Sequence, residues 1–348
     1  MPIVTTEHFK SGNLPLSKNG IPQVSEDDYC RLKGYRLETD DIVFSRVGSV
    51  DINAHVEHVQ QGWLFSGRVL RVRPIKSVNS LCLHYVLSTE SVKRDIRNRA
   101  VGQTMPSINT PILSNTGIYM SQSEAEQKKI ANLLSIIDER ISTQNKIIED
   151  LKKLKSAIIE KLYKEIQGTW YSYRQLFSII NERNKQLEYS NVLSASQERG
   201  MVSREDLNLD IHFEHSNIST YKIVKNGDYV IHLRSFQGGF AFSEKTGICS
   251  PAYTVLRPNN LLVYGYLSNY FTSRDFVKSL IIVTYGIRDG RSINVDEWLD
   301  MKVVIPSKEQ QTHIVNVIES IENKIKNEET YSNCLLNQKQ YLLRQMFI

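Results

Sequence analysis

Two short stretches of the sequence combine residue types that can bind zinc. They read HVEH at residues 55–58 and HFEH at residues 212–215. Imidazole and carboxylate groups both ligate Zn²⁺. However, a strand or loop places alternate residues on opposite faces, the two stretches do not align in the internal repeat described below, and neither has a third cluster of His or Cys. We therefore interpret them as solvated polar residues and predict no metal site.

The common catalytic motifs are absent from the sequence. It contains no GxxxxGK[ST] phosphate loop, no GxGxxG, no HExxH, and no NPP followed by an aromatic residue as in amino-methyltransferases. A metal-dependent nuclease would usually show Pro-Asp ahead of Asp/Glu-x-Lys, and Pro-Asp does not occur. We predict no catalytic residue in this chain.

Polar loops offer a different chemistry, namely hydrogen bonding to nucleic acid. RVGS at residues 46–49 and LRSFQGG at 233–239 follow corresponding strand candidates, and GQT at 102–104 corresponds to part of YGIRDGR at 285–291. Arg and Gln can bond in pairs to guanine and adenine edges, whereas Ser, Thr and backbone N–H groups hold phosphates. Because the loops recur at matching places, we predict two DNA-contacting surfaces. The candidate residues are Arg46, Ser49, Gln103, Arg234, Ser235, Gln237, Arg288 and Arg291.

Two stretches 184 residues apart predict the elements that hold these loops. They read SEAEQKKIANLLSIIDERI from residue 123 and SKEQQTHIVNVIESIENKI from residue 307. In both, apolar residues recur at alternating steps of three and four, which is the heptad seam of a long helix. A helix of about 40 residues is roughly 60 Å long and needs a partner of equal length. We predict that the two helices pair antiparallel through Ile130, Ile137, Ile141, Leu151, Ile314, Ile321, Ile325 and Leu335.

The repeat extends into the segments that precede the helices. LRVRP at residues 70–74 stands 184 residues before TVLRP at 254–258, and an acidic turn leads into a strand at residues 40–44 and again at 227–231. Short strands together with helices over residues 80–97 and 261–278 predict α+β units. The expected fold class is α+β: two similar α/β domains in tandem, separated by two long helices that pair as an antiparallel coiled coil with pseudo-twofold symmetry.

The domain boundaries follow from this repeat. The first domain is expected at residues 1–121, the central helix at 122–167, the second domain at 168–306 and the C-terminal helix at 307–348. The second domain has about 20 residues, 170–190, ahead of the strand that matches residues 2–5 of the first. We therefore expect the first domain to be shortened at its N-terminus.

Composition agrees with a folded protein of two or more domains. The chain has 348 residues, of which 41 % are hydrophobic and 23 % charged, and its net charge of +5 leans mildly toward a polyanionic partner. It contains no apolar run long enough to span a membrane and no signal-peptide pattern, so we expect a cytoplasmic protein without a membrane partner. The four cysteines form no CxxC and are expected to be reduced.

A family resemblance is carried by the two helical sequences from residues 123 and 307, by the strand TDDIVFSRVGS, and by GDYVIHLRSFQGG followed by SPAYTVLRP. In these stretches the sequence resembles the specificity subunits of type I restriction-modification systems. The resemblance covers nearly the whole chain. It implies that each domain reads one half of a bipartite, asymmetric DNA target and that the paired helices fix the distance between the halves. It also implies two docked methyltransferase subunits that modify adenine and, in a restriction complex, a motor-nuclease subunit. S-adenosylmethionine, Mg²⁺ and ATP would then belong to the partners, and this chain would hold no cofactor.

Two other functions compete with this one. A coiled-coil adaptor that binds only proteins would lack salt-dependent affinity for duplex DNA. A metal-dependent nuclease built on the two HxEH stretches would contain bound zinc or manganese when purified.

Overall fold

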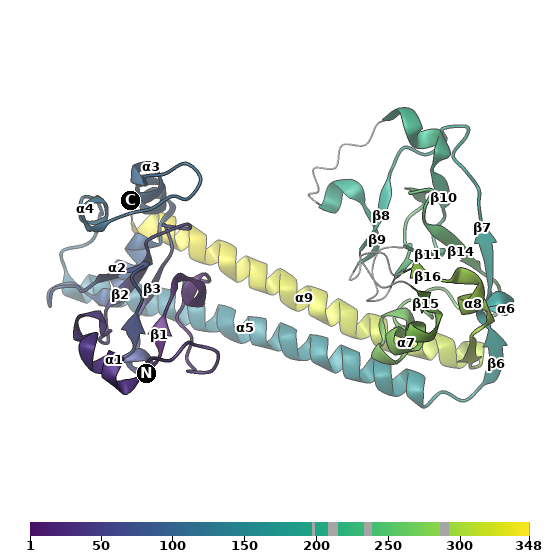
Figure 1. The fold of residues 1–348 in the computed structure, drawn as a ribbon, viewed down its shortest axis with the longest axis horizontal. Coiled ribbons are helices and arrows are strands. Elements are labelled where there is room, and N and C mark those ends of the chain that lie inside the picture. The colour runs from purple at the N-terminus through teal and green to yellow at the C-terminus, as the bar shows by residue number, and fades with distance from the viewer. Residues whose placement is uncertain (197–198, 208–214, 233–238, 286–291, 348) are drawn as a thin grey trace. The chain divides into compact units, whose positions relative to one another are not determined.

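The computed structural model describes residues 1–196, 199–207, 215–232, 239–285 and 292–347 (Figure 1). The chain divides into two compact units. Unit 1 comprises Met1–Lys146 and Glu329–Ile348, and unit 2 comprises Ile147–Glu328. In the described residues, no helix is both long and apolar enough to span a membrane.

Unit 1 is built around a three-stranded antiparallel sheet. Its strand order is β3 (Asn53–His55), β2 (Ile42–Ser45) and β5 (Val69–Val72), and the short strands β1 (Ile3–Val4) and β4 (Leu64–Phe65) pair in parallel beside it. All four residues of β2 are buried, which is why it is the central strand. Four short helices complete the unit: α1 (Glu26–Arg31), α2 (Ser80–Leu87), α3 (Glu90–Arg99) and α4 (Thr110–Ser114).

Side-chain caps begin three of these helices. At the start of α1, the Ser25 hydroxyl accepts a hydrogen bond from the Asp28 N–H. Asn79 accepts a hydrogen bond from the Cys82 N–H at the start of α2, and Asn109 accepts one from the Ile112 N–H at the start of α4. Such caps satisfy backbone donors that have no partner within the helix. The remaining short elements of unit 1 are the 3₁₀ turns η1 (Thr6–Phe9), η2 (Lys33–Tyr35) and η3 (His58–Gln60).

Unit 2 contains a four-stranded antiparallel sheet of related order. The strands are β12 (Phe240–Phe242), β11 (Tyr229–Ile231), β14 (Thr254–Pro258) and β7 (Phe177–Ile180). Four two-stranded pairs accompany it: β10 (Lys222–Val224) with β13 (Gly247–Cys249), β8 (Leu193–Ser196) with β9 (Gly200–Ser203), β17 (Lys302–Ile305) with β6 (Thr169–Ser172), and β15 (Thr284–Tyr285) with β16 (Ser292–Ile293).

The core of unit 2 is aromatic. Tyr173 stacks on Trp298 with ring centroids 4.3 Å apart, and Phe271 and Phe276 pack beside them. Offset or tilted aromatic pairs add to the stabilisation from burial alone. These rings lie on the short helices α6 (Tyr173–Leu176), α7 (Arg274–Ser279) and α8 (Val295–Asp300) and on the 3₁₀ turn η6 (Tyr270–Thr272). The other 3₁₀ turns described in unit 2 are η4 (Arg204–Leu207), η5 (His215–Thr220) and η7 (Leu280–Val283).

The expectation of one helix over residues 261–278 is wrong. The structure has turns followed by η6, and α7 begins only at Arg274. Gly265 has φ +72°, and the Ser273 side chain caps the new helix by accepting from the Phe276 N–H. A left-handed residue and a new cap both interrupt a helix, so the apolar residues of this segment enter the core from several short pieces.

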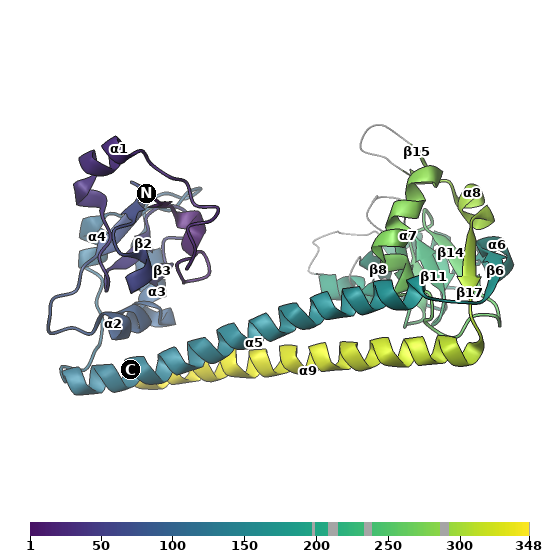
Figure 2. The same cartoon turned by 90° about the horizontal axis from the view of Figure 1, so that it is seen from below.

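Two long helices run through both units. They are α5 (Glu124–Lys164), with 41 residues, and α9 (Lys308–Met346), with 39. Within each unit they lie side by side and antiparallel (Figure 2). Ile137 and Ile141 pack on Leu335 in unit 1, and Ile159 joins the unit 2 core that contains Ile314. The predicted α+β fold with two long antiparallel helices is confirmed.

The remaining residues predicted to pair the helices differ in how deeply they are buried. Ile325 is buried, whereas Ile130, Leu151 and Ile321 are half-buried. Equivalent ion pairs also join the helices: Lys339 Nζ lies 2.5 Å from an Asp138 oxygen, and Lys155 Nζ lies 2.5 Å from a Glu322 oxygen. The second pair repeats the first after the 184-residue step, with the two helices exchanging roles.

Candidate nucleic-acid interface

A buried carboxylate holds the turn that precedes each central strand. Asp41 accepts from Nε and Nη2 of Arg73 at 2.7 and 2.8 Å, and from the Glu38 N–H at 2.8 Å. In unit 2, Asp228 accepts two bonds of 2.9 Å from Arg257. The pKa of Arg73 and of Arg257 is raised, chiefly by these hydrogen bonds, so both stay cationic. The repeated Arg-Pro dipeptides are therefore framework residues that fix where the following loops start.

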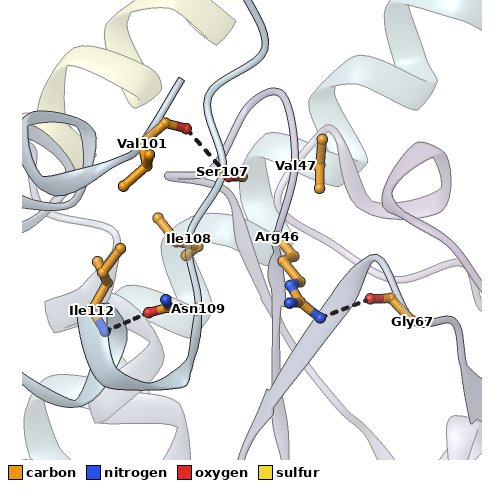
Figure 3. Close-up of a pocket in the computed structure, with 8 residues that line it drawn as sticks. All are labelled: Arg46, Val47, Gly67, Val101, Ser107, Ile108, Asn109 and Ile112. Carbon is orange, nitrogen blue, oxygen red and sulfur yellow. Dashed lines mark hydrogen bonds between the residues drawn. The ribbon is translucent and has the colours of Figure 1, made fainter. Parts of the chain in front are cut away.

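The two predicted loops of unit 1 meet at one end of the sheet (Figure 3). Arg46, directly after β2, donates its N–H to the Arg68 carbonyl, and its own carbonyl accepts from the Ile108 N–H, both at 2.9 Å. Ser107 forms isolated antiparallel bridges with both Val47 and Val101. Residues 46–49 and 101–107 are thus tied side by side, although they are far apart in the sequence.

Glycine is required at two points of this junction. Gly48 has φ +82° and Gly102 has φ +105°, both in the left-handed region. A Cβ atom at Gly102 would lie 2.8 Å from the Met105 carbonyl oxygen. The backbone therefore turns tightly on each side of the junction and leaves the neighbouring polar side chains at the surface.

The structure places Arg46, Ser49 and Gln103 at the surface of this junction. The Arg46 guanidinium makes one long hydrogen bond, 3.4 Å to the Gly67 carbonyl. Among the described residues, no carboxylate pairs with it, whereas the exposed guanidinium groups of Arg73, Arg97 and Arg99 have acidic partners. A guanidinium without an acidic partner keeps its charge and donors available to a ligand.

A pocket of about 360 Å³ lies beside Arg46. It is lined by Arg46, Val47, Gly67, Val101, Ser107, Ile108, Asn109 and Ile112 (Figure 3). Its polar wall is mostly occupied by internal bonds, since the Ser107 hydroxyl donates to the Val101 carbonyl and Asn109 caps α4. The pocket therefore offers backbone and Arg46 as its main contacts.

Arg68 belongs to the same surface and was not among the predicted residues. Arg68 is exposed, and its carbonyl accepts a hydrogen bond from the Arg46 N–H. Arg46 follows β2 and Arg68 precedes β5, so the two arginines lie at the same end of neighbouring strands. The signal in the sequence is weak, because Arg68 has no counterpart in the repeat, where Ala252 stands.

The corresponding candidates of unit 2 lie outside the described residues. They are Arg234, Ser235, Gln237, Arg288 and Arg291. Their flanks repeat the frame of unit 1. The His232 N–H donates to the Gly239 carbonyl at 2.7 Å, and Tyr285 pairs with Ser292 as Val101 pairs with Ser107.

The two histidines of the HVEH stretch lie on different secondary-structure elements of unit 1. His55 ends β3 with its Nε2 3.2 Å from an Asp40 oxygen, and His58 begins η3. Residues 212–214 lie outside the described part of the chain. Within the part that is described, no group of three His, Cys, Asp or Glu side chains could hold a metal ion.

Equivalent glutamines anchor each long helix to its unit. The Gln127 amide accepts from the Asn79 N–H at 2.7 Å and donates to the Ser121 carbonyl at 2.8 Å. Gln311 accepts from the Val263 N–H at 2.8 Å and donates to the carbonyls of Leu261 and Pro306. Both side chains are buried, so their role is to fix the helix and not to contact DNA.

Comparison with known proteins gives one consistent group. Residues 1–153 match the family described as type I restriction modification DNA specificity domain. The putative type I restriction enzyme MjaX specificity subunit of Methanocaldococcus jannaschii is 25 % identical over 369 aligned residues, covering 93 % of this chain and 81 % of that protein. The type I restriction enzyme MjaVIII specificity subunit of the same organism is 25 % identical over 305, covering 76 % and 69 %.

Two solved structures share the fold. One comes from work on complex assembly and conformational transition of the type I R-M system; it has a TM-score of 0.59 and 14 % identity, covering 90 % of this chain and 82 % of that one. The other is the type I restriction-modification S subunit from M. genitalium, with a TM-score of 0.54 and 14 % identity, covering 90 % and 84 %.

Proposed function

We propose that this chain, which belongs to the specificity subunits of type I restriction-modification systems, recognises a bipartite, asymmetric DNA sequence with its two units. This proposal rests on the observation that the framework is repeated, whereas the loops recur in position but differ in sequence. The buried Asp bonded to the Arg of Arg-Pro, here called the acidic clamp, and the buried Gln that fixes each long helix, here called the glutamine anchor, recur in both units. In contrast, RVGS follows β2 and LRSFQGG follows β11. Two similar frameworks that carry different loops are suited to the recognition of two different DNA half-sites.

In unit 1 the reading surface proposed is the junction that carries Arg46, Ser49 and Gln103, with Arg68 added beside it. A guanidinium can bond to both acceptors of guanine, and an amide can bond to adenine in the same paired way. In unit 2 the proposal assigns the same role to the segments that contain Arg234, Ser235, Gln237, Arg288 and Arg291.

The proposed protein partners are two methyltransferase subunits docked on the long helices, with a restriction subunit as a further possible partner. The outer faces of the helices carry apolar side chains that suit a protein interface: Leu133 and Ile136 are 41 % and 50 % exposed on α5 of unit 1, and Leu154 is 50 % exposed on α5 of unit 2. In this assignment the chain has no catalysis of its own. S-adenosylmethionine, Mg²⁺ and ATP act in the partners, which methylate adenine or cleave DNA.

The test is the salt dependence of DNA binding. The chain is co-expressed with the methyltransferase subunit encoded beside it, and binding of the purified complex to duplex DNA is measured between 50 and 200 mM salt, where affinity for phosphate contacts changes by orders of magnitude. We expect tight, salt-dependent binding by the complex and weaker binding by the chain alone. A complex whose affinity for duplex DNA does not depend on salt would instead identify a protein adaptor.

A further inference from the structure

In unit 2 the chain covers one edge of its own sheet. β7 pairs antiparallel with β14, and just before it β6 pairs antiparallel with β17. Residues 169–180 are therefore a strand–turn–strand segment whose turn is the four-residue helix α6, and its two strands lie on two strands of the unit. Asn259 holds its turn, because its N–H donates to the Leu176 carbonyl at 3.0 Å and its side chain donates to the Gln175 carbonyl at 2.7 Å.

The equivalent strands of unit 1 are not covered. The counterpart of β14 is β5, which among the described residues pairs only with β2. The counterpart of β17 is residues 117–120, which follow α4 as β17 follows α8 and form no strand there. Ile75, which follows β5, and Tyr119 are 71 % and 79 % exposed, whereas Val303 of β17 is 7 % exposed.

Among the described residues, no backbone partner is bonded to the outward donors and acceptors of Arg71 and Arg73 along this edge. Arg46 donates its N–H to the Arg68 carbonyl, so residues 68, 70 and 72 bond to β2 in the antiparallel ladder. Arg71 and Arg73 alternate with them and present N–H and C=O groups outward. Their counterparts in unit 2, Val255 and Arg257, lie opposite Ile180 and Ser178 of β7. An exposed strand edge of this kind is a template for another strand.

We propose that unit 1 binds a strand–turn–strand segment of another polypeptide chain at this open edge, defined as the outer side of β5 with residues 117–120. One strand of the segment pairs antiparallel with residues 71–73, and the other pairs along residues 117–120. The occupant has the aromatic and β-branched character of residues 169–180, and its apolar side chains cover Ile75 and Ile118. Residues 169–180 of the chain itself are not available to unit 1, because Tyr173 and Leu176 are buried in unit 2.

The proposal is independent of DNA recognition and is tested without DNA. The probe is a fluorescein-labelled peptide with the sequence of residues 167–182, titrated with the full-length chain by fluorescence anisotropy. Hydrogen exchange of the protein is followed with and without the peptide. We expect saturable binding, with slowed exchange at residues 71–73 and 117–120 and unchanged exchange at residues 255–258.

Arg71 provides a matched pair of variants. Arg71→Pro removes the outward N–H without removing a bond to β2, and proline is tolerated on such an edge. Arg71→Ala keeps that N–H and loses the same guanidinium contact with the Arg36 carbonyl. We expect at least tenfold weaker peptide binding by Arg71→Pro than by Arg71→Ala.

Three results would overturn the proposal: no saturable binding, slowed exchange at residues 255–258 instead of the open edge, or equal binding by the two variants. Thermal unfolding shows whether Arg71→Pro remains folded. If it does not, the exchange pattern of the unaltered protein decides alone.

Discussion

At the scale of single residues, the repeat is kept most closely where a buried polar side chain closes a turn. Asp41 and Asp228 each accept two hydrogen bonds from one arginine side chain. Each also accepts a hydrogen bond from the backbone N–H of the residue three positions earlier in the chain. These contacts explain why the Arg-Pro dipeptides recur in the sequence. They serve the framework and leave the neighbouring loops free to differ.

Asp41→Asn should lower the free energy of unfolding by about 2–3 kcal/mol, because it removes a buried charge partner of Arg73. The matched control is Glu38→Gln, which alters the exposed partner of the same guanidinium and should cost less than about 1 kcal/mol. Urea denaturation followed by circular dichroism measures both. Equal losses for the two variants would show that burial of Asp41 does not matter.

His84 should make unit 1 sensitive to mild acid. The side chain is buried, its Nδ1 lies 2.6 Å from the Asn53 side-chain oxygen, and burial lowers its pKa to about 3. The unfolded chain takes up the proton near pH 6.5, so this contribution to stability is complete above pH 6.5 and is lost as the pH falls toward 3.

Between pH 6.5 and 5, the slope of unfolding free energy from His84 should approach about 1.4 kcal/mol per pH unit. His84→Gln keeps a hydrogen-bonding side chain and should reduce that slope, as measured by denaturant titrations across this pH range. An unchanged slope would mean that His84 is protonated in the folded chain.

Arg46→Ala should weaken binding of the assembled complex to its DNA target by about 1–3 kcal/mol if Arg46 bonds to a base. The control is Arg99→Ala, which removes an exposed arginine already paired with Asp95. Fluorescence anisotropy with target and unrelated duplexes measures both variants. A loss no larger than that of the control would remove Arg46 from the reading surface.

At the scale of elements, the long helices were predictable because their apolar period is local and sustained. The junction between residues 46–49 and 101–107 was only partly predictable: the loops stood out as polar and repeated, but their pairing through Ser107 is a long-range contact. The break before α7 and the role of Arg68 carried weaker signals. Apolar residues at 261–278 satisfy a helical pattern equally well as one helix or as several short pieces.

Gln311→Ala should lower the free energy of unfolding by about 2 kcal/mol, since it removes a buried side chain and leaves the Val263 N–H and two carbonyls without their partner. Gln310→Ala is the matched control, because that side chain is exposed and should change stability by less than about 0.5 kcal/mol. Thermal unfolding compares the two. Similar melting temperatures would argue that the helix is held by apolar packing alone.

At the scale of the whole molecule, the chain is two versions of one design. Each unit has the same sheet order around its central strand, the same acidic clamp and the same glutamine anchor, while the loops at the end of the sheet differ. Unit 2 also carries residues 169–180 on its sheet edge, and unit 1 leaves the equivalent edge open. The proposed recognition of two unlike half-sites rests on this combination of equal frameworks and unequal loop sequences.

The most direct measurement is a map of methylated adenines in genomic DNA exposed to the complex of this chain with its methyltransferase subunits, read by single-molecule sequencing. The account predicts one bipartite motif with two unlike halves separated by unread bases. Methylation at a continuous or palindromic motif by a folded, assembled complex would contradict it.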